Sequence, residues 1–283
     1  MAKQGFQKKL KNKFFMKRLL IALQLLTIIP VRTNMIVTEA DIAKSSSVFV
    51  LVGLIQGIIL ITTDYLAGRV FHPDLVTGLI LLVYVLSNGG FHLDGLADTF
   101  DAIAAKSEGT LNADKQKRLS ILKDAATGPI GVTAIVFSLG LKYLSLNNLT
   151  HFLSFTYYSS LLLLPVISKW TMVISMFYGK PAREDGLGCI FINKIGLKEI
   201  VISTMILLLL LPLPQLFFSA YIPSSQYIFY AVLLVTMYFL CRAWIHFFHK
   251  KFGGLTGDTL GAISEITEVI FLLLVIVWSR FSI

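Results

Sequence analysis

Charge is scarce in this chain. Only 14% of its 283 residues are charged, and only 16 are Asp or Glu, whereas about a quarter of the residues of a soluble domain are charged. Hydrophobic residues make up 55% of the sequence, and the mean hydropathy is +0.76. This composition excludes an ordinary soluble protein and predicts an integral membrane protein.

Cysteine is scarcer still, with Cys189 and Cys241 alone in the sequence. Two cysteines exclude a disulfide framework and a cysteine-rich metal cluster, so we expect both to be ordinary small residues. The net charge of +9 could indicate nucleic-acid binding. The Lys and Arg residues cluster beside apolar runs, however, and membrane topology explains that placement better. We expect no nucleic-acid partner.

Long apolar runs dominate the sequence instead. Seven of them are close to or above the length of about 17 residues that crosses the hydrocarbon of a bilayer. They are Val48–Leu66, Leu75–Phe91, Ile130–Leu146, Phe152–Phe177, Glu199–Ala220, Tyr227–Phe247 and Ala262–Trp278. A further run, Leu19–Val31, is too short to cross and predicts an interfacial or re-entrant segment. Residues 1–283 are therefore expected to form a single all-α, polytopic membrane domain.

The basic residues alternate between the connections that join these runs. The N-terminal arm and every second connection carry several Lys or Arg, and the other connections carry almost none. The positive-inside rule then predicts a cytoplasmic N-terminus, seven crossings and an outer C-terminus. It also places the polar motifs described below on the cytoplasmic side, and it makes the basic arm an anchor against anionic lipid headgroups.

The most informative motif lies directly after the second run, where Asp94, Asp98 and Asp101 follow His92. On a helix, the three carboxylates fall within an arc of roughly 60°. Like charges on one face repel, so a cation between them is expected, and Mg²⁺ prefers such oxygen ligands. We predict that these three residues bind a metal. His92 is either a base that positions a nucleophile or a solvated boundary residue.

Two further motifs carry candidate phosphate ligands. Lys123 and Asp124 precede Gly128-Pro129, where the exposed N–H groups of a helix start could bind a phosphate oxygen. Gly-Pro is also a common way to start a helix that has no binding role. Lys180 and Arg183 could hold a pyrophosphate, Arg183 through its planar fork. The alternative is that Lys180 and Arg183 belong to a basic cytoplasmic loop that forms a turn and has no binding role.

The fourth motif leads into the last apolar run, where Asp258, Glu265 and Glu268 share a helix face. Glu265 and Glu268 lie inside the run, where an ionisable side chain is costly and is functional by default. We predict that they add a second acidic group facing the metal or substrate. The alternative is a polar contact between helices.

The sequence resembles the cobalamin synthases, which are membrane-bound adenosylcobinamide-GDP ribazoletransferases. The resemblance spans nearly the whole chain, in family order, and is most specific in the acidic stretch from Gly90 and in Thr256-Gly257-Asp258. The matching segments are Ala22–Val31, Gly89–Asp101, Lys123-Asp124, Ala182–Gly188 and Gly254–Glu268. The chain departs from the expected pattern at Pro129 and at Lys169, where we expect Arg. Lys at that position would weaken any bidentate phosphate contact.

This resemblance implies an Mg²⁺-dependent enzyme of the bacterial cell membrane. Its substrates would be adenosylcobinamide-GDP and α-ribazole or α-ribazole 5′-phosphate, and GMP would leave. Asp94, Asp98 and Asp101 would then hold Mg²⁺. Lys123, Lys180, Arg183 and Glu265 would contact the substrates. The proton acceptor stays open among His92, Asp124 and Asp258, and a homo-oligomer is possible.

Two other functions remain as alternatives. An ion-coupled transporter also carries acidic residues within its spans, but it should show two related halves, and no repeat is visible. A CDP-alcohol-type phosphotransferase shares the Asp-Gly-x-x-Asp pattern that Asp94–Asp98 shows. The chain lacks the longer pattern, with two further spaced Asp, that such an enzyme carries.

Overall fold

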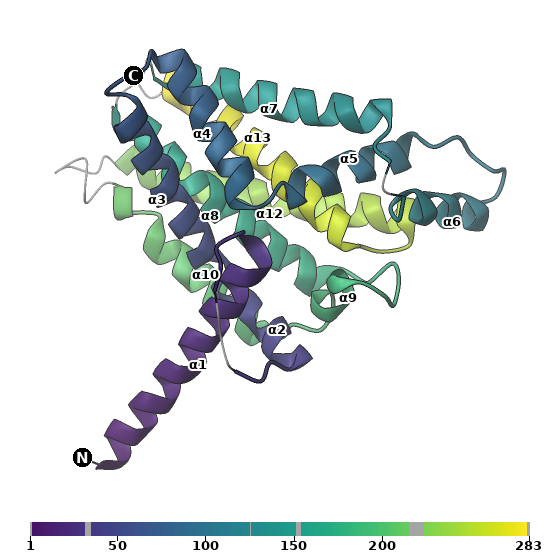
Figure 1. The fold of residues 1–283 in the computed structure, drawn as a ribbon, viewed down its shortest axis with the longest axis horizontal. Coiled ribbons are helices and arrows are strands. Elements are labelled where there is room, and N and C mark those ends of the chain that lie inside the picture. The colour runs from purple at the N-terminus through teal and green to yellow at the C-terminus, as the bar shows by residue number, and fades with distance from the viewer. Residues whose placement is uncertain (1, 32–34, 125, 151–153, 215–223, 282–283) are drawn as a thin grey trace.

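The computed structural model describes residues 2–31, 35–124, 126–150, 154–214 and 224–281 (Figure 1). Within these ranges every named element is a helix, which confirms the all-α prediction. The longer elements are α1 (Ala2–Leu26), α3 (Phe49–Ala67), α4 (Pro73–Ser87), α5 (Phe91–Ala104), α6 (Leu111–Ile121), α7 (Pro129–Leu149), α8 (Ser154–Tyr178), α10 (Leu197–Leu210), α12 (Ser224–Phe252) and α13 (Gly257–Phe281). The short ones are α2 (Glu39–Ser45), η1 (Ser46–Val48) and α9 (Leu187–Phe191).

Helix α8 forms the centre of the bundle. Every residue from Ser159 to Met176 is buried, because α3, α10, α12 and α13 all pack against this helix. An apolar helix buried on all sides needs no polar face, and its run Leu161–Leu164 shows none. Polar side chains on α8 bond either to carbonyls of α8 itself, as Ser160 and Ser175 do, or to side chains of neighbouring helices. The second arrangement becomes important below for Lys169.

In the described part of the chain five helices are long and apolar enough to cross a membrane, and they contain α3, α7, α8, α12 and α13. A sixth crossing results if α4 and α5 count as one bent span. The chain is therefore a multi-pass membrane protein, but the predicted count of seven is not confirmed. The start of the predicted run Phe152–Phe177 and the end of Glu199–Ala220 lie outside the described residues, and within them α10 has 14 residues.

The predicted run Leu75–Phe91 is not one straight helix. Helix α4 ends at Ser87, and α5 leaves it at 86° after a three-residue break. Gly89 and Gly90 have φ values of 65° and 72°, a left-handed conformation that ends an α-helix and that glycine adopts at least cost. The predicted run Leu19–Val31 forms the end of α1 and the segment after it, and Ile28 donates its N–H to the Ser87 carbonyl at 3.0 Å.

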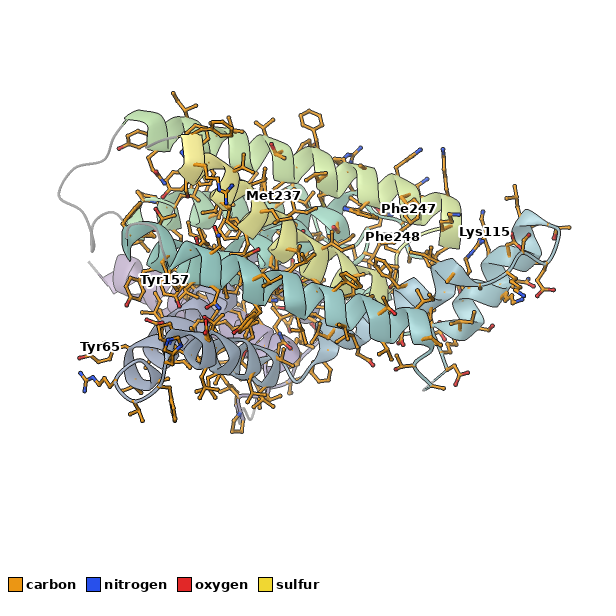
Figure 2. All side chains as sticks on the ribbon, turned by 90° about the horizontal axis from the view of Figure 1, so that it is seen from above. Tyr65, Lys115, Tyr157, Met237, Phe247 and Phe248 are labelled. Atoms are coloured by element: carbon orange, nitrogen blue, oxygen red, sulfur yellow. The ribbon has the colours of Figure 1, made fainter. Side chains whose placement is uncertain are left out.

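The polar motifs gather at one end of the bundle. Figure 1 shows α5, α6 and the first turns of α7 and α13 together at that end, while α3, α7 and α13 finish at the opposite one. Figure 2 places Lys115 of α6 at the first end and Tyr65 and Tyr157 at the other. The opposite end carries the connections that are expected to be short and to have few charges. The four predicted motifs therefore converge although they are far apart in the sequence.

Candidate active site

The acidic end of the bundle is built where α5 crosses α13. A Cβ atom on Gly95 would lie 2.7 Å from the carbonyl oxygen of Asp258, and one on Gly261 would lie 3.2 Å from the Cα of His92. Only glycine allows two helices to approach this closely. The crossing brings Asp258 of α13 beside the face of α5 that carries Asp94 and Asp98. Asp94 is exposed and Asp98 is partly buried.

The carboxylates of this end lie close enough to repel one another. Asp98 feels the negative charges of Asp94, Asp258, Asp101 and Asp124, in that order of strength. Of these five residues, three including Asp98 come from α5, Asp258 comes from the start of α13, and Asp124 comes from the turn after α6. The structure therefore brings together all the acidic residues predicted for the site except Glu265 and Glu268. Such unbalanced charge is what a bound cation or a cationic side chain would relieve.

Asp101 has a second role that the sequence analysis did not predict. Its carboxylate accepts the backbone N–H of Gly128 at 2.6 Å and that of Gly131 at 2.8 Å. It therefore caps α7, where a negative charge also complements the helix dipole. The prediction that these N–H groups bind a substrate phosphate is wrong for this structure, because Asp101 occupies them. The metal role of Asp101 stays a prediction.

His92 points into the bundle and not toward the exposed carboxylates. It is buried, and its Nε2 lies 2.8 Å from Nζ of Lys169. A charged Lys has donors and no acceptor, so Nε2 accepts this hydrogen bond and the imidazole is neutral with its proton on Nδ1. The alternative of a solvated boundary residue is wrong. A base must reach its substrate, and the position of His92 does not support that role.

A parallel backbone bridge between Pro181 and Leu255 holds the loop that contains Lys180 and Arg183 beside the start of α13. Ala182 donates to the Leu255 carbonyl at 2.9 Å, and Leu255 donates to the Lys180 carbonyl at 2.7 Å. This bridge joins the predicted phosphate loop to the segment that precedes Asp258. It explains why Arg183, which lies 75 residues before Asp258 in the sequence, reaches the acidic face.

Arg183 faces the carboxylates without being fully engaged. Its Nη2 lies 3.5 Å from Asp258 and its Nε lies 3.6 Å from Asp185. Both distances exceed the roughly 2.7–2.9 Å of a charge-assisted hydrogen bond. Its Nη1 is buried and has no hydrogen-bond partner among the described residues. Part of the guanidinium is therefore free to receive an anionic oxygen.

Lys123 joins this group through Asp185, which the sequence analysis did not single out. Lys123 donates to Asp185 at 2.7 Å, and this contact lowers the pKa of the Asp185 carboxyl. Both side chains are largely exposed, so the pair is weak and easily opened. Lys180 is exposed and forms no ion pair within the described part of the chain. Its backbone N–H bonds to His249 Nε2 at 3.1 Å.

Glu265 and Glu268 do not face the acidic end. Both are buried in the bundle and both bind Lys142 of α7, Glu265 at 2.5 Å. The prediction of a second metal-facing acidic group is therefore wrong, and the polar contact between helices is the arrangement found. A buried carboxylate requires a partner of opposite charge, and Lys142 supplies it. A single Lys inside the run Ile130–Leu146 was the sequence signal for this partner.

The acidic end suits Mg²⁺ by its donor chemistry. Asp94, Asp98 and Asp258 offer only carboxylate oxygens, and Mg²⁺ is commonly bound by one or two carboxylates together with water and substrate phosphates. Among the described residues no group of three or more His, Cys, Asp or Glu is close enough to bind one ion by itself. The protein groups therefore fit an ion whose remaining ligands come from a phosphate-bearing substrate.

Comparisons with known proteins identify the family of this chain. A family model described as cobalamin-5-phosphate synthase matches residues 18–276. An adenosylcobinamide-GDP ribazoletransferase from Thermodesulfovibrio yellowstonii is 35% identical over 257 residues, which cover 90% of this chain and 94% of that protein. One from Caldanaerobacter subterraneus is 36% identical over 261 residues, covering 90% and 96%. No solved structure matches. The chain belongs to the cobalamin-5-phosphate synthase family.

Proposed function

We propose that this chain is an adenosylcobinamide-GDP ribazoletransferase. In the reaction, a hydroxyl of α-ribazole or of its 5′-phosphate attacks the phosphorus that is attached to cobinamide. A new P–O bond forms, the P–O bond to the bridging diphosphate oxygen breaks, and GMP leaves with that oxygen. The family assignment and the names of the relatives support this transfer. They do not favour the transporter or the CDP-alcohol phosphotransferase.

The observation that carries the proposal is the pairing of opposite charges at the α5–α13 crossing. Asp94 and Asp98 lie on one side, and Arg183 with its unpartnered Nη1 lies beside Asp258 on the other. A diphosphate with a bound cation needs both kinds of group. Transfer of this kind depends mainly on positioning and on electrostatic stabilisation of the phosphate oxygens.

Asp94 and Asp98 would hold Mg²⁺ together with water and the phosphate oxygens of the substrate, and Asp258 and Asp101 would add their charges beside it. Bound there, the ion would draw charge from the bridging oxygen and make GMP a better leaving group. Arg183 and Lys123 would neutralise the remaining phosphate oxygens, and Asp185 would be displaced from them. Lys180 would contribute only if its exposed side chain turned toward the site.

Asp124 is the proposed acceptor of the hydroxyl proton. His92 is buried, and Asp258 already contacts Arg183 and accepts from Thr256 at 3.1 Å. Asp124 is exposed and close enough to Asp98 to repel it, and among the described residues its carboxylate accepts only the backbone N–H of Ala126 at 3.2 Å. It can therefore approach a substrate hydroxyl, as a general base must.

We further propose that this end faces the cytoplasm of the bacterial cell, because the connections gathered here carry more Lys and Arg than those at the opposite end. Cysteine labelling tests this orientation. Single cysteines placed at Ser107 and at Arg69 should be protected and accessible, respectively, to a membrane-impermeant reagent added to intact cells. The opposite pattern would overturn the orientation and leave the chemistry untouched.

The activity is tested with protein purified into liposomes, adenosylcobinamide-GDP, each acceptor in turn and Mg²⁺. The expected result is GMP and a corrinoid product in equal amounts, lost on chelation and restored by added Mg²⁺. Folded protein that gives no product with either acceptor would contradict the proposed function. Turnover that survives chelation would contradict the metal role alone.

A further inference from the structure

Four charged side chains are buried together in the middle of the bundle. They are 0–2% exposed and consist of two cations and two carboxylates. We call them the buried quartet: Lys142 of α7, Lys169 of α8, and Glu265 and Glu268 of α13. The formal charges of the quartet sum to zero. In an apolar interior an unpaired charge is expensive, whereas a balanced set is tolerated.

Lys142 makes the direct contacts of the quartet. It binds both carboxylates, Glu265 also accepts from Ser138 at 3.0 Å, and Glu268 accepts from the Tyr84 hydroxyl at 2.6 Å. Lys169 completes the balance by its charge alone, since within the described residues it contacts His92 at 2.8 Å and forms no ion pair with either glutamate. Each carboxylate therefore has a cation and a neutral donor. Removal of Lys142 alone would leave two carboxylates facing a single Lys.

The quartet connects the helices that carry the proposed site. Glu268 reaches α4 through Tyr84, and Lys169 reaches α5 through His92, which precedes Asp94 by two residues. Glu265 lies two helical turns after Asp258 on α13. The cluster below the acidic end therefore has its glutamates on α13, and its Lys169 contacts α5 through His92. A change in the cluster would shift Asp94 and Asp98 relative to Asp258.

We propose that the buried quartet is a charge-balanced anchor that positions α5 against α13. Its members are positioning residues and do not touch the substrates. What the fold requires is the neutrality of the set, and no single carboxylate of it is required for itself. Glu265 and Glu268 therefore serve the site through geometry. The part of this proposal that concerns turnover rests on the proposed function, and the part that concerns folding does not.

Three variants distinguish a requirement for neutrality within the quartet from a requirement for the overall charge or for Glu265 itself. Lys142→Met leaves the quartet with one uncompensated negative charge. Lys142→Met with Glu265→Gln restores neutrality and leaves Glu268 with Tyr84 and Lys169. The matched control combines Lys142→Met with Glu199→Gln, which gives the same net charge. Glu199 is a buried carboxylate outside the quartet that bonds to the backbone of Gly196 at 3.1 Å.

The measurements are the yield of monodisperse protein from membranes, the thermal midpoint in detergent, and kcat and KM in liposomes. Lys142→Met should lose at least about tenfold in folded yield or in kcat, because removing one partner of a buried ion pair leaves the other charge buried without a partner. The Glu265→Gln double variant should return to within about threefold of the wild type, since a balanced replacement is often neutral. KM should change little, and the Glu199→Gln double variant should stay as poor as Lys142→Met.

Several results would overturn the anchor. A Lys142→Met protein with normal yield, midpoint and kcat would show that the balance is not needed. Equal rescue by Glu199→Gln would show that only the overall charge is sensed. A Glu265→Gln double variant that folds normally but has no turnover would assign Glu265 a role of its own in the site. If the wild type has no transferase activity, yield and midpoint still decide the question, so the two proposals fail separately.

Discussion

The molecule has two concentrations of acidic side chains, and their surroundings differ. At the end of the bundle Asp94, Asp98 and Asp258 repel one another, and within the described residues the one ion pair that any of the three forms is between Asp258 and Arg183 at 3.5 Å. In the interior, Glu265 and Glu268 share Lys142 and each accepts a further hydrogen bond. Unbalanced carboxylates at an accessible surface invite a ligand, whereas balanced ones in the interior fix a structure.

This difference shows that residue type and helical spacing do not distinguish a binding site from an anchor. Asp94 and Asp98 are four residues apart, and Glu265 and Glu268 are three apart, so each pair lies on one helix face. The deciding factor is whether another helix brings a cation to them. Lys142 does so for the glutamates. The predictions below test this distinction, beginning with the largest effect.

The largest loss of activity is expected for Asp98→Asn. The change removes a proposed metal ligand from the accessible face, so kcat/KM should fall at least about a hundredfold. The thermal midpoint should stay the same or rise, because one source of repulsion disappears. Turnover and unfolding are measured on the same preparation. Near-normal turnover would remove Asp98 from the site.

A smaller effect is expected for Arg183→Lys, which keeps the charge and loses the planar fork. We expect kcat/KM to fall about tenfold, mostly through KM, because a phosphate loses bidentate contact. Arg280→Lys is the matched control, since Arg280 is exposed in the last turn of α13 at the opposite end. Equal effects at both positions would contradict a specific contact at Arg183.

His92 distinguishes positioning from base catalysis. Glutamine can still accept from Lys169, so His92→Gln should keep kcat within about threefold, whereas His92→Leu leaves Lys169 without this acceptor and should lose about tenfold or more. The pH profile of kcat/KM should keep its shape in His92→Gln. Equal loss in both variants, with disappearance of the acidic limb of the profile, would instead identify His92 as the base.

Asp101 should affect stability more than its neighbours do. Asp101→Ala leaves the N–H groups of Gly128 and Gly131 without their acceptor, which costs about 1–3 kcal/mol of unfolding free energy. Asp101→Asn, which retains an acceptor, should cost less. Chemical unfolding in detergent measures both. An unchanged stability in Asp101→Ala would show that this cap contributes nothing.

The smallest effect is expected for Asp185→Asn, because the pair with Lys123 is exposed. The lowered pKa of Asp185 means that the pair is fully formed above the pKa of an unfolded Asp and is lost as the pH falls through the lower folded value. Kinetics between pH 6 and 8 should therefore change by less than about threefold. A large loss of kcat in this range would place Asp185 in the site itself.

Much of the fold and of the acidic site follows from the sequence. Apolar runs predict the helices, and the alternating basic residues predict that Asp94, Asp258 and Arg183 share one end. The count of seven crossings is not confirmed, because Gly89-Gly90 ends α4 early and turns the chain, and because α10 has only 14 residues within the described part. The burial of His92 could have been predicted, since two residues correspond to about 200° around a helix and place it opposite Asp94.

Other features depend on tertiary contacts that no local pattern contains. The N–H groups of Gly128 and Gly131 are bound by Asp101, which lies 27 and 30 residues away in the sequence. Lys142 binds glutamates 123 and 126 residues further along the chain. Local spacing indicates that such groups need partners. The identity of the partner follows only from the helix packing.

The most direct test of this account compares the two acidic regions in one experiment. Wild type, Asp98→Asn, and Lys142→Met combined with Glu265→Gln are placed in the same liposomes, and GMP release and thermal midpoint are measured for each. We predict that Asp98→Asn is folded and inactive, and that the double variant is folded and active. An active Asp98→Asn protein, or a folded but inactive double variant, would contradict the assignment of catalysis to the end of the bundle and of anchoring to its interior.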